Sequence, residues 1–174
     1  MRRVVVTGVG AVTPLGGDTN PSWKNLIDGK SGASSITRFA ATGFPSTIAC
    51  EVPLGAGISS SDGTFNPDDW VSTKDQKKID TFILYGIAAA EMALKDSGWI
   101  PNDENSQFRA GVGVGSGIGG LASIEKTSLL LKEKGPRRVS PFFIPGALIN
   151  LAAGQISIRN NLDYKGNPIA KKKS

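Results

Sequence analysis

The sequence predicts an α/β fold in which helices cover a layered, mostly parallel sheet. Short runs rich in β-branched residues alternate along the chain with longer segments of helical periodicity, and glycine or proline separates them. Such an alternation of strands and helices is typical of parallel sheets. With 174 residues, 39% of them hydrophobic, the chain is long enough to bury one core.

Three strands are predicted. The first is a run of valines that ends at Gly8, and the second is rich in β-branched residues. The third alternates glycine with valine, so that other backbone could approach it closely. The three strands span residues 3–8, 46–52 and 109–115.

Four longer segments predict helices. Asn20 and Pro21 are typical of an N-cap and a first helical position. Thr73 and Gln76 have the spacing of a capping box, and Gly98 follows the last apolar residues of that segment. The predicted helices span residues 22–28, 74–97, 122–134 and 146–158.

The residue counts exclude several kinds of site. The chain has no histidine and a single cysteine, Cys50. A Ser–His or Cys–His nucleophile pair, a zinc site rich in histidine or cysteine, and an internal disulfide are therefore excluded. Cys50 lies in the second predicted strand without a neighbouring base, so we expect a buried, inert thiol.

The charge is concentrated at the C-terminus. The net charge is +5, but four of the 20 basic residues lie in the last ten positions, which leaves the rest of the chain at +1. We expect a folded region over residues 1–162 and a basic, disordered tail over residues 163–174. Residues 1–162 offer no basic stripe of the kind that binds nucleic acid. No apolar run in the sequence is long enough to span a membrane. We therefore expect a cytoplasmic protein.

Two further features leave alternatives open. Gly115–Gly120 matches the pattern G-x-G-x-x-G between a predicted strand and a helix, which suits either a dinucleotide or close packing of helix and strand. The adjacent residues Phe142 and Phe143 suit either a core or an interface. A set of basic residues indicates either an acidic partner or a solvated helix face: Lys74, Lys77, Lys78, Arg137 and Arg138.

Several segments together resemble the N-terminal half of a β-ketoacyl-acyl-carrier-protein synthase of the elongating type, which has a thiolase-like fold. The resemblance runs from about residue 2 to about residue 159, with the motifs in the family's order. It is carried by Arg3–Gly16, Trp23–Gly32, Lys74–Asp80, Gly115–Leu121, Ser140–Pro145 and Asn150–Gln155.

The resemblance implies an enzyme that condenses an acyl thioester with malonyl-carrier protein and releases carbon dioxide. It implies a homodimer that uses no metal or nucleotide cofactor. Ile118 would line the acyl pocket, and Phe143 would reach the far end of the partner subunit's pocket. The five basic residues would face the acidic acyl-carrier protein.

The chain also departs from the family. The catalytic cysteine, two histidines and lysine of the family have no counterpart, and Cys50 is not at the nucleophile position. We therefore expect a form truncated before the catalytic cysteine and catalytically incompetent. The alternatives are a non-catalytic module that binds acyl-carrier protein or a full-length synthase subunit, and nucleotide binding through Gly115–Gly120. We also expect the helix faces at residues 79–90 and 146–158 to lack cover without a second half.

Overall fold

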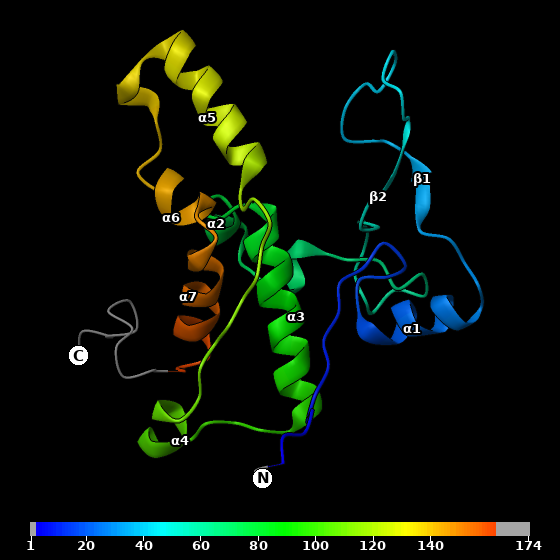
Figure 1. Cartoon of the computed structure of the whole chain (residues 1–174), viewed down its shortest axis with the longest axis vertical. Helices are drawn as coiled ribbons and strands as arrows, with labels where there is room; N and C mark the ends of the chain where they lie inside the picture. The colour runs from blue at the N-terminus through cyan, green and yellow to red at the C-terminus, as the bar shows by residue number, and fades with distance from the viewer. Residues whose placement is uncertain (1–2, 163–174) are drawn as a thin grey trace.

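Two packed helices form the centre of the protein. In the computed structural model, which describes residues 3–162, α3 (Thr81–Ser97) lies beside α7 (Asn150–Arg159) (Figure 1). Ile83 and Ile87 from α3 and Ile156 from α7 are at most 4% exposed. The predicted tail, residues 163–174, lies outside the described residues.

The predicted helix 74–97 is two helices, which corrects the sequence prediction. α2 (Thr73–Gln76) is capped by Ser72 rather than by Thr73. Asp80 then adopts an extended backbone conformation, and its carboxylate accepts a hydrogen bond from the Phe82 amide at the start of α3. The side chain of Asp80 thus begins a second helix at a point where the continuous apolar periodicity predicts a single uninterrupted helix. Gly98, at φ 64°, ends α3 as predicted.

The predicted helix 146–158 is also divided. Leu148 is extended, with ψ 139°, and separates α6 (Phe143–Ala147) from α7. α5 (Leu121–Lys134) confirms the predicted helix 122–134, including its end at Gly135. α1 (Thr19–Ile27) begins earlier than predicted because Asp18, not Asn20, is its N-cap.

The mostly parallel sheet is not formed by the described residues. The sheet within residues 3–162 is one antiparallel pair, β1 (Ala33–Ser35) and β2 (Ile48–Cys50), with Ala33 opposite Cys50. β2 confirms the centre of the second predicted strand. The first predicted strand, residues 3–8, makes no backbone–backbone hydrogen bond within the described chain. In the third predicted strand, residues 109–115, only Arg109 and Ala110 make such bonds, and these belong to the end of α4.

Both unpaired segments pack on a helix instead. A Cβ atom at Gly8 or Gly10 would overlap the carbonyl oxygens of Ala93 and Ala89 on α3. Val112 and Val114 pack against the same core. These contacts account for Gly8, Gly10 and the two valines, but Val4–Val6 are exposed and an added Cβ at Gly111, Gly113 or Gly115 would have no neighbour within 4 Å. Strands are stable only when backbone pairs with backbone.

Short elements connect the longer ones. η1 (Pro67–Asp69), α4 (Glu104–Phe108) and η2 (Pro136–Arg138) were not predicted, since each has at most five residues. Phe65, fully buried, packs edge-on against Tyr85 with ring centroids 5.2 Å apart. In the described part of the chain, no helix has the length and apolarity that crossing a membrane requires.

The expected exposure of the two helix faces is wrong for most of their apolar residues. α3 and α7 cover each other, and their facing apolar residues form the core. Leu148 (45%) and Ile158 (44%) are exposed within residues 146–158, but the largest exposed fractions belong to Val4 (92%) and Val6 (83%) in the unpaired N-terminal segment.

Candidate functional site

Four basic side chains line a single cavity between α2, α5, η2 and α6. The cavity, here called the basic recess, has a volume of about 180 Å³. Lys77 and Lys78 reach it from the link after α2, Lys126 from α5 and Arg138 from η2. The hydroxyl-bearing residues Ser123, Thr127 and Ser140 also line it. No Asp or Glu is among its lining residues.

The link between α2 and α3 positions the two lysines. α2 ends at Gln76, and Asp80 begins α3 four residues later. The Asp80 amide donates to the Gly146 carbonyl of α6 at 3.1 Å. The Asp80 carboxylate also accepts hydrogen bonds from the amide and hydroxyl of Ser123 on α5, at 3.1 and 2.6 Å. Asp80 therefore joins the three elements that form the walls of the recess.

Lys78 is held in place by a carboxylate and a ring. Its Nζ lies 2.6 Å from Asp75 Oδ1 and 5.5 Å from the centre of the Phe142 ring. Its hydrogen bond holds the pKa of the Asp75 carboxyl below the ordinary value of 3.8, and the Ser72 hydroxyl adds to this effect. Lys78 is thus partly neutralised, while Lys77, Lys126 and Arg138 have no ion-pair partner within residues 3–162.

The predicted basic set is partly brought together. Lys77, Lys78 and Arg138 line the recess, whereas Lys74 and Arg137 are exposed on the same elements outside it. Sequence reasoning missed Lys126. Its signal was the helical spacing of residues 123, 126, 127 and 130, which form one face of α5 and all line the recess.

The two predicted acyl-pocket residues, Ile118 and Phe143, do not line the same cavity. Phe143, in α6, lines the basic recess together with Phe142. Ile118, in the glycine-rich loop, is 63% exposed and lines neither the recess nor the cavity described next. The position of Phe142 over Lys78 places this aromatic pair at a surface cavity rather than in the central core.

The glycine-rich loop packs against protein. A Cβ at Gly119 would lie 2.7 Å from the Ala147 oxygen, and one at Gly120 would lie 2.9 Å from the Ala147 Cα. The Ser123 amide in the first turn of α5 donates to the Asp80 carboxylate, so this amide is not free to bind a phosphate. This geometry favours the packing interpretation over nucleotide binding.

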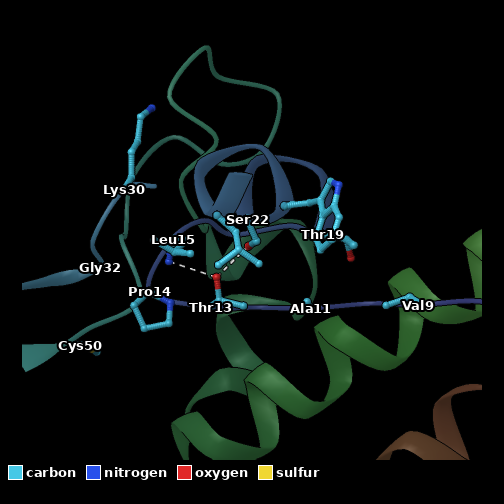
Figure 2. A pocket seen from close by; sticks show the side chains of 12 residues that line it. Val9, Ala11, Thr13, Pro14, Leu15, Thr19, Ser22, Lys30, Gly32 and Cys50 are labelled. Carbon is cyan, nitrogen blue, oxygen red and sulfur yellow. Dashed lines mark hydrogen bonds between the residues drawn. The ribbon is translucent and has the colours of Figure 1, made fainter. Parts of the chain in front are cut away.

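A larger cavity, of about 430 Å³, lies beside α1 (Figure 2). Its walls are mainly apolar. Two of its three hydroxyl groups bond to one another, since Thr13 Oγ1 lies 2.8 Å from Ser22 Oγ and also accepts from the Leu15 amide at 3.0 Å. The third hydroxyl, Thr19 Oγ1, is buried and has no hydrogen-bond partner within the described residues. Cys50 lines this cavity and is exposed, so the expectation of a buried thiol is wrong. The reason is that β2 belongs to a small two-stranded sheet away from the core.

No catalytic arrangement accompanies that thiol. The cavity beside α1 has no carboxylate or histidine among its lining residues, so it lacks the Cys–His pairing of a catalytic thiol. Within residues 3–162, no group of three or more Asp, Glu or Cys side chains has the arrangement to hold a metal ion. The basic recess is therefore the candidate functional site, and its chemistry is recognition of negative charge.

Solved structures of ketosynthases share the fold. A β-ketoacyl synthase from Burkholderia phymatum STM815 superposes with a TM-score of 0.71 at 25% identity, and covers 95% of this chain and 38% of its own. A ketosynthase in complex with its type II PKS acyl-carrier protein gives 0.67 at 29% identity, over 94% and 41% of the two chains. The fold class is thus that of thiolase-like ketosynthases, as predicted.

The sequence comparisons identify the family. The family model for the N-terminal domain of β-ketoacyl synthases matches residues 1–170, and the chain belongs to this family. The 3-oxoacyl-[acyl-carrier-protein] synthase 2 of Rhizobium meliloti (strain 1021) is 55% identical over 162 residues, which is 93% of this chain. The corresponding protein of Coxiella burnetii (strain RSA 493 / Nine Mile phase I) is 45% identical over 97% of this chain. The chain spans 38% of the length of each relative.

Proposed function

We propose that this chain forms the carrier-docking part of a 3-oxoacyl-acyl-carrier-protein synthase in fatty-acid elongation, which works in the cytoplasm. The observation that carries the proposal is the clustering of Lys77, Lys78, Lys126 and Arg138 around one recess that lacks carboxylates. Two supporting facts are the family membership and the similar ketosynthase that was solved with an acyl-carrier protein bound.

The reaction proposed for the complete enzyme is decarboxylative condensation. Malonyl-carrier protein loses carbon dioxide, and the carbanion that remains attacks the carbonyl of an acyl group held as a thioester on a cysteine. The new carbon–carbon bond forms as the carbon–sulfur bond to that cysteine breaks, and the cysteine leaves as a thiolate. This chain contains no histidine, and the cavity beside Cys50 is lined by no carboxylate. We therefore expect that this polypeptide by itself does not catalyse the reaction, and that its own contribution is binding.

The proposed roles of the two apolar site residues follow from the resemblance. Ile118, on the exposed part of the glycine-rich loop, would contribute to the wall of the acyl pocket. Phe143 would act across a homodimer interface. α6, which carries Phe143, is attached to α3 through the hydrogen bond between Asp80 and Gly146, so docking and pocket residues share one support.

Titration with an unmodified acyl-carrier protein tests the proposal. We expect binding at low ionic strength that weakens as salt is added, because exposed charges are screened. Lys77→Glu together with Arg138→Glu should abolish binding. The control Lys132→Glu together with Lys134→Glu makes the same total change in charge on α5 outside the recess, and should reduce binding less than the recess variant. Binding that resists salt, or equal losses in both variants, would contradict the proposal.

The non-catalytic alternative uses the same surface. If the chain acts as a binding module for carrier protein or for a full-length synthase subunit, its docking residues are those of the recess. The absence of histidine favours a role of this kind for the isolated polypeptide. A condensation assay on the purified chain, read as carbon dioxide release, should give no turnover, and turnover would overturn this view.

A further inference from the structure

The cavity beside α1 has the volume and the walls of a small-molecule site. We propose that it binds an aliphatic chain of medium length that ends in a carboxylate. The cavity shares no lining residue with the basic recess, and neither Ile118 nor Phe143 lines it, so the inference goes beyond carrier docking. It follows from the volume of the cavity, the apolarity of its walls and the charge at one end.

The volume suits a chain of medium length. At about 430 Å³, the cavity lies within the range of about 300–1,000 Å³ that is typical of small-molecule pockets. It corresponds to roughly fourteen water molecules at about 30 Å³ each. Because a CH₂ group is about as large as a water molecule, a chain of about eight to ten carbon atoms would fit together with its carboxylate.

The walls present apolar side chains that an aliphatic ligand would cover. Trp23 and Leu26 come from α1 and Val9 from the N-terminal segment, and they are 61%, 56% and 50% exposed. Exposed apolar side chains that gather around one concave surface are typical of a binding site. Thr13 and Ser22, which also line the cavity, bond to one another, so their hydroxyl groups need no partner from a ligand.

A single charged residue selects the head group of the ligand. Among the described residues that line the cavity, Lys30 is the only charged one. Its Nζ donates to Asn25 Oδ1 at 2.8 Å and lies 4.0 Å from Asp28 Oδ2, which Lys24 binds more closely, at 2.9 Å. An ammonium group has three N–H donors, so Lys30 can still donate to a carboxylate at the mouth of the cavity.

The charged and the apolar parts of the cavity lie at opposite edges. In Figure 2, Lys30 and Gly32 lie at one edge of the cavity, while Val9 and Thr19 lie at the other. A ligand with one anionic end matches this arrangement, because its carboxylate would meet Lys30 while its chain extends toward Val9. A cationic head group would meet a like charge at Lys30, and a second charge at the far end would lie against apolar walls.

Titration with simple alkanoates tests the proposal directly. The ¹⁵N-labelled chain would be titrated with hexanoate and octanoate below their micelle concentrations, at about pH 7.5, where carboxylates are ionised. We expect shifts at the amides of Ala11, Leu15 and Trp23. Octanoate should bind about fifteen-fold more tightly than hexanoate, since each CH₂ group that leaves water adds about four-fold. Equal affinities of the two, or shifts centred on the basic recess, would overturn the inference.

A matched pair of variants on α1 identifies the apolar wall. Leu26→Ala should weaken octanoate binding about five-fold, because the ligand then covers less apolar surface. Ile27→Ala removes the neighbouring side chain, which is 67% exposed and does not line the cavity, and should leave the affinity within about two-fold. Both side chains are exposed, so both variants should keep the wild-type fold, which circular dichroism checks. Equal losses in the two variants would overturn the inference.

The head group and the mouth of the cavity have their own tests. Lys30→Met should weaken octanoate binding about three-fold, the size of an exposed ion pair, and should leave octanol binding unchanged. Cys50 is the single cysteine, is exposed and lines the cavity, so saturating octanoate should slow its alkylation by iodoacetamide several-fold. Equal losses for octanoate and octanol in Lys30→Met, or an unchanged alkylation rate, would contradict the proposed binding mode.

Discussion

The carboxylate of Asp80 accepts two hydrogen bonds from Ser123, although the residues are 43 positions apart. The Ser123 amide donates at 3.1 Å and its hydroxyl at 2.6 Å. The same carboxylate caps α3 through the Phe82 amide. One side chain therefore joins the start of α3 to the start of α5, and the basic recess forms along that junction.

Removing this junction should destabilise the fold. Asp80→Ala should lower the free energy of unfolding by about 2–3 kcal/mol, since it removes a cap and a charge-assisted pair. Ser123→Ala should cost about 1 kcal/mol. The double variant should cost less than the sum of the two, because the residues are in contact. Urea unfolding measures all three.

A second cap provides the control. Asp18 caps α1 through the Asn20 amide at 3.2 Å and has no hydrogen bond to α5 in the described chain. Asp18→Ala combined with Ser123→Ala should therefore be additive. If the losses of unfolding free energy in Asp80→Ala and Ser123→Ala also add up in the double variant, the hydrogen bonds between Asp80 and Ser123 contribute no coupling. That result would contradict the junction described above.

Gly10 should not tolerate a side chain. A Cβ atom there would overlap the Ala89 carbonyl oxygen of α3, so Gly10→Ala should destabilise the protein by about 1–3 kcal/mol. Gly113→Ala is the matched control, because nothing lies within 4 Å of its added Cβ. Thermal unfolding of both variants checks the prediction, which fails if Gly113→Ala is the more harmful change.

Ile87 should be essential to the packing of α3. It is 1% exposed, and Ile87→Ala should cost about 2–5 kcal/mol through lost burial and the cavity left behind. Ile158 of α7 is 44% exposed, so Ile158→Ala should cost clearly less. Equal losses in urea unfolding would show that the two helices do not pack as described.

The sequence predicted the helices better than their boundaries. Periodicity identified the buried face of α3, and Gly98 marked its end, because both signals are local. The break between α2 and α3 was missed because the Asp80 carboxylate that begins α3 is also held by a hydrogen bond from Ser123, a residue far along the chain. Lys126 was missed because a search for apolar periodicity does not register a polar helix face.

The parallel sheet could not be predicted reliably for a different reason. Valine-rich runs such as residues 3–8 are typical of buried strands, but a strand also needs a backbone partner, which no local pattern supplies. In the described chain, that run instead places Gly8 against α3 and leaves Val4 and Val6 exposed. The family resemblance, in contrast, rested on several motifs in order, and the comparisons confirmed it.

Acid should weaken the attachment of Lys78. Its hydrogen bond to Asp75 lowers the pKa of that carboxyl, so the contact stabilises the fold above pH 3.8 and is lost as the pH falls through the lower folded value. The carboxyl ¹³C signal of Asp75 should therefore titrate below 3.8. Lys78→Met should raise the midpoint more than Lys132→Met does, and an unchanged midpoint would contradict the ion pair.

Mapping the carrier-protein footprint tests the central claim most directly. Amide shifts of the ¹⁵N-labelled chain would be followed while an unmodified acyl-carrier protein is added at low salt. We expect the shifts to concentrate around the basic recess, at Lys77, Ser123, Lys126 and Arg138. Shifts centred on the apolar cavity beside α1, around Trp23 and Cys50, would contradict it.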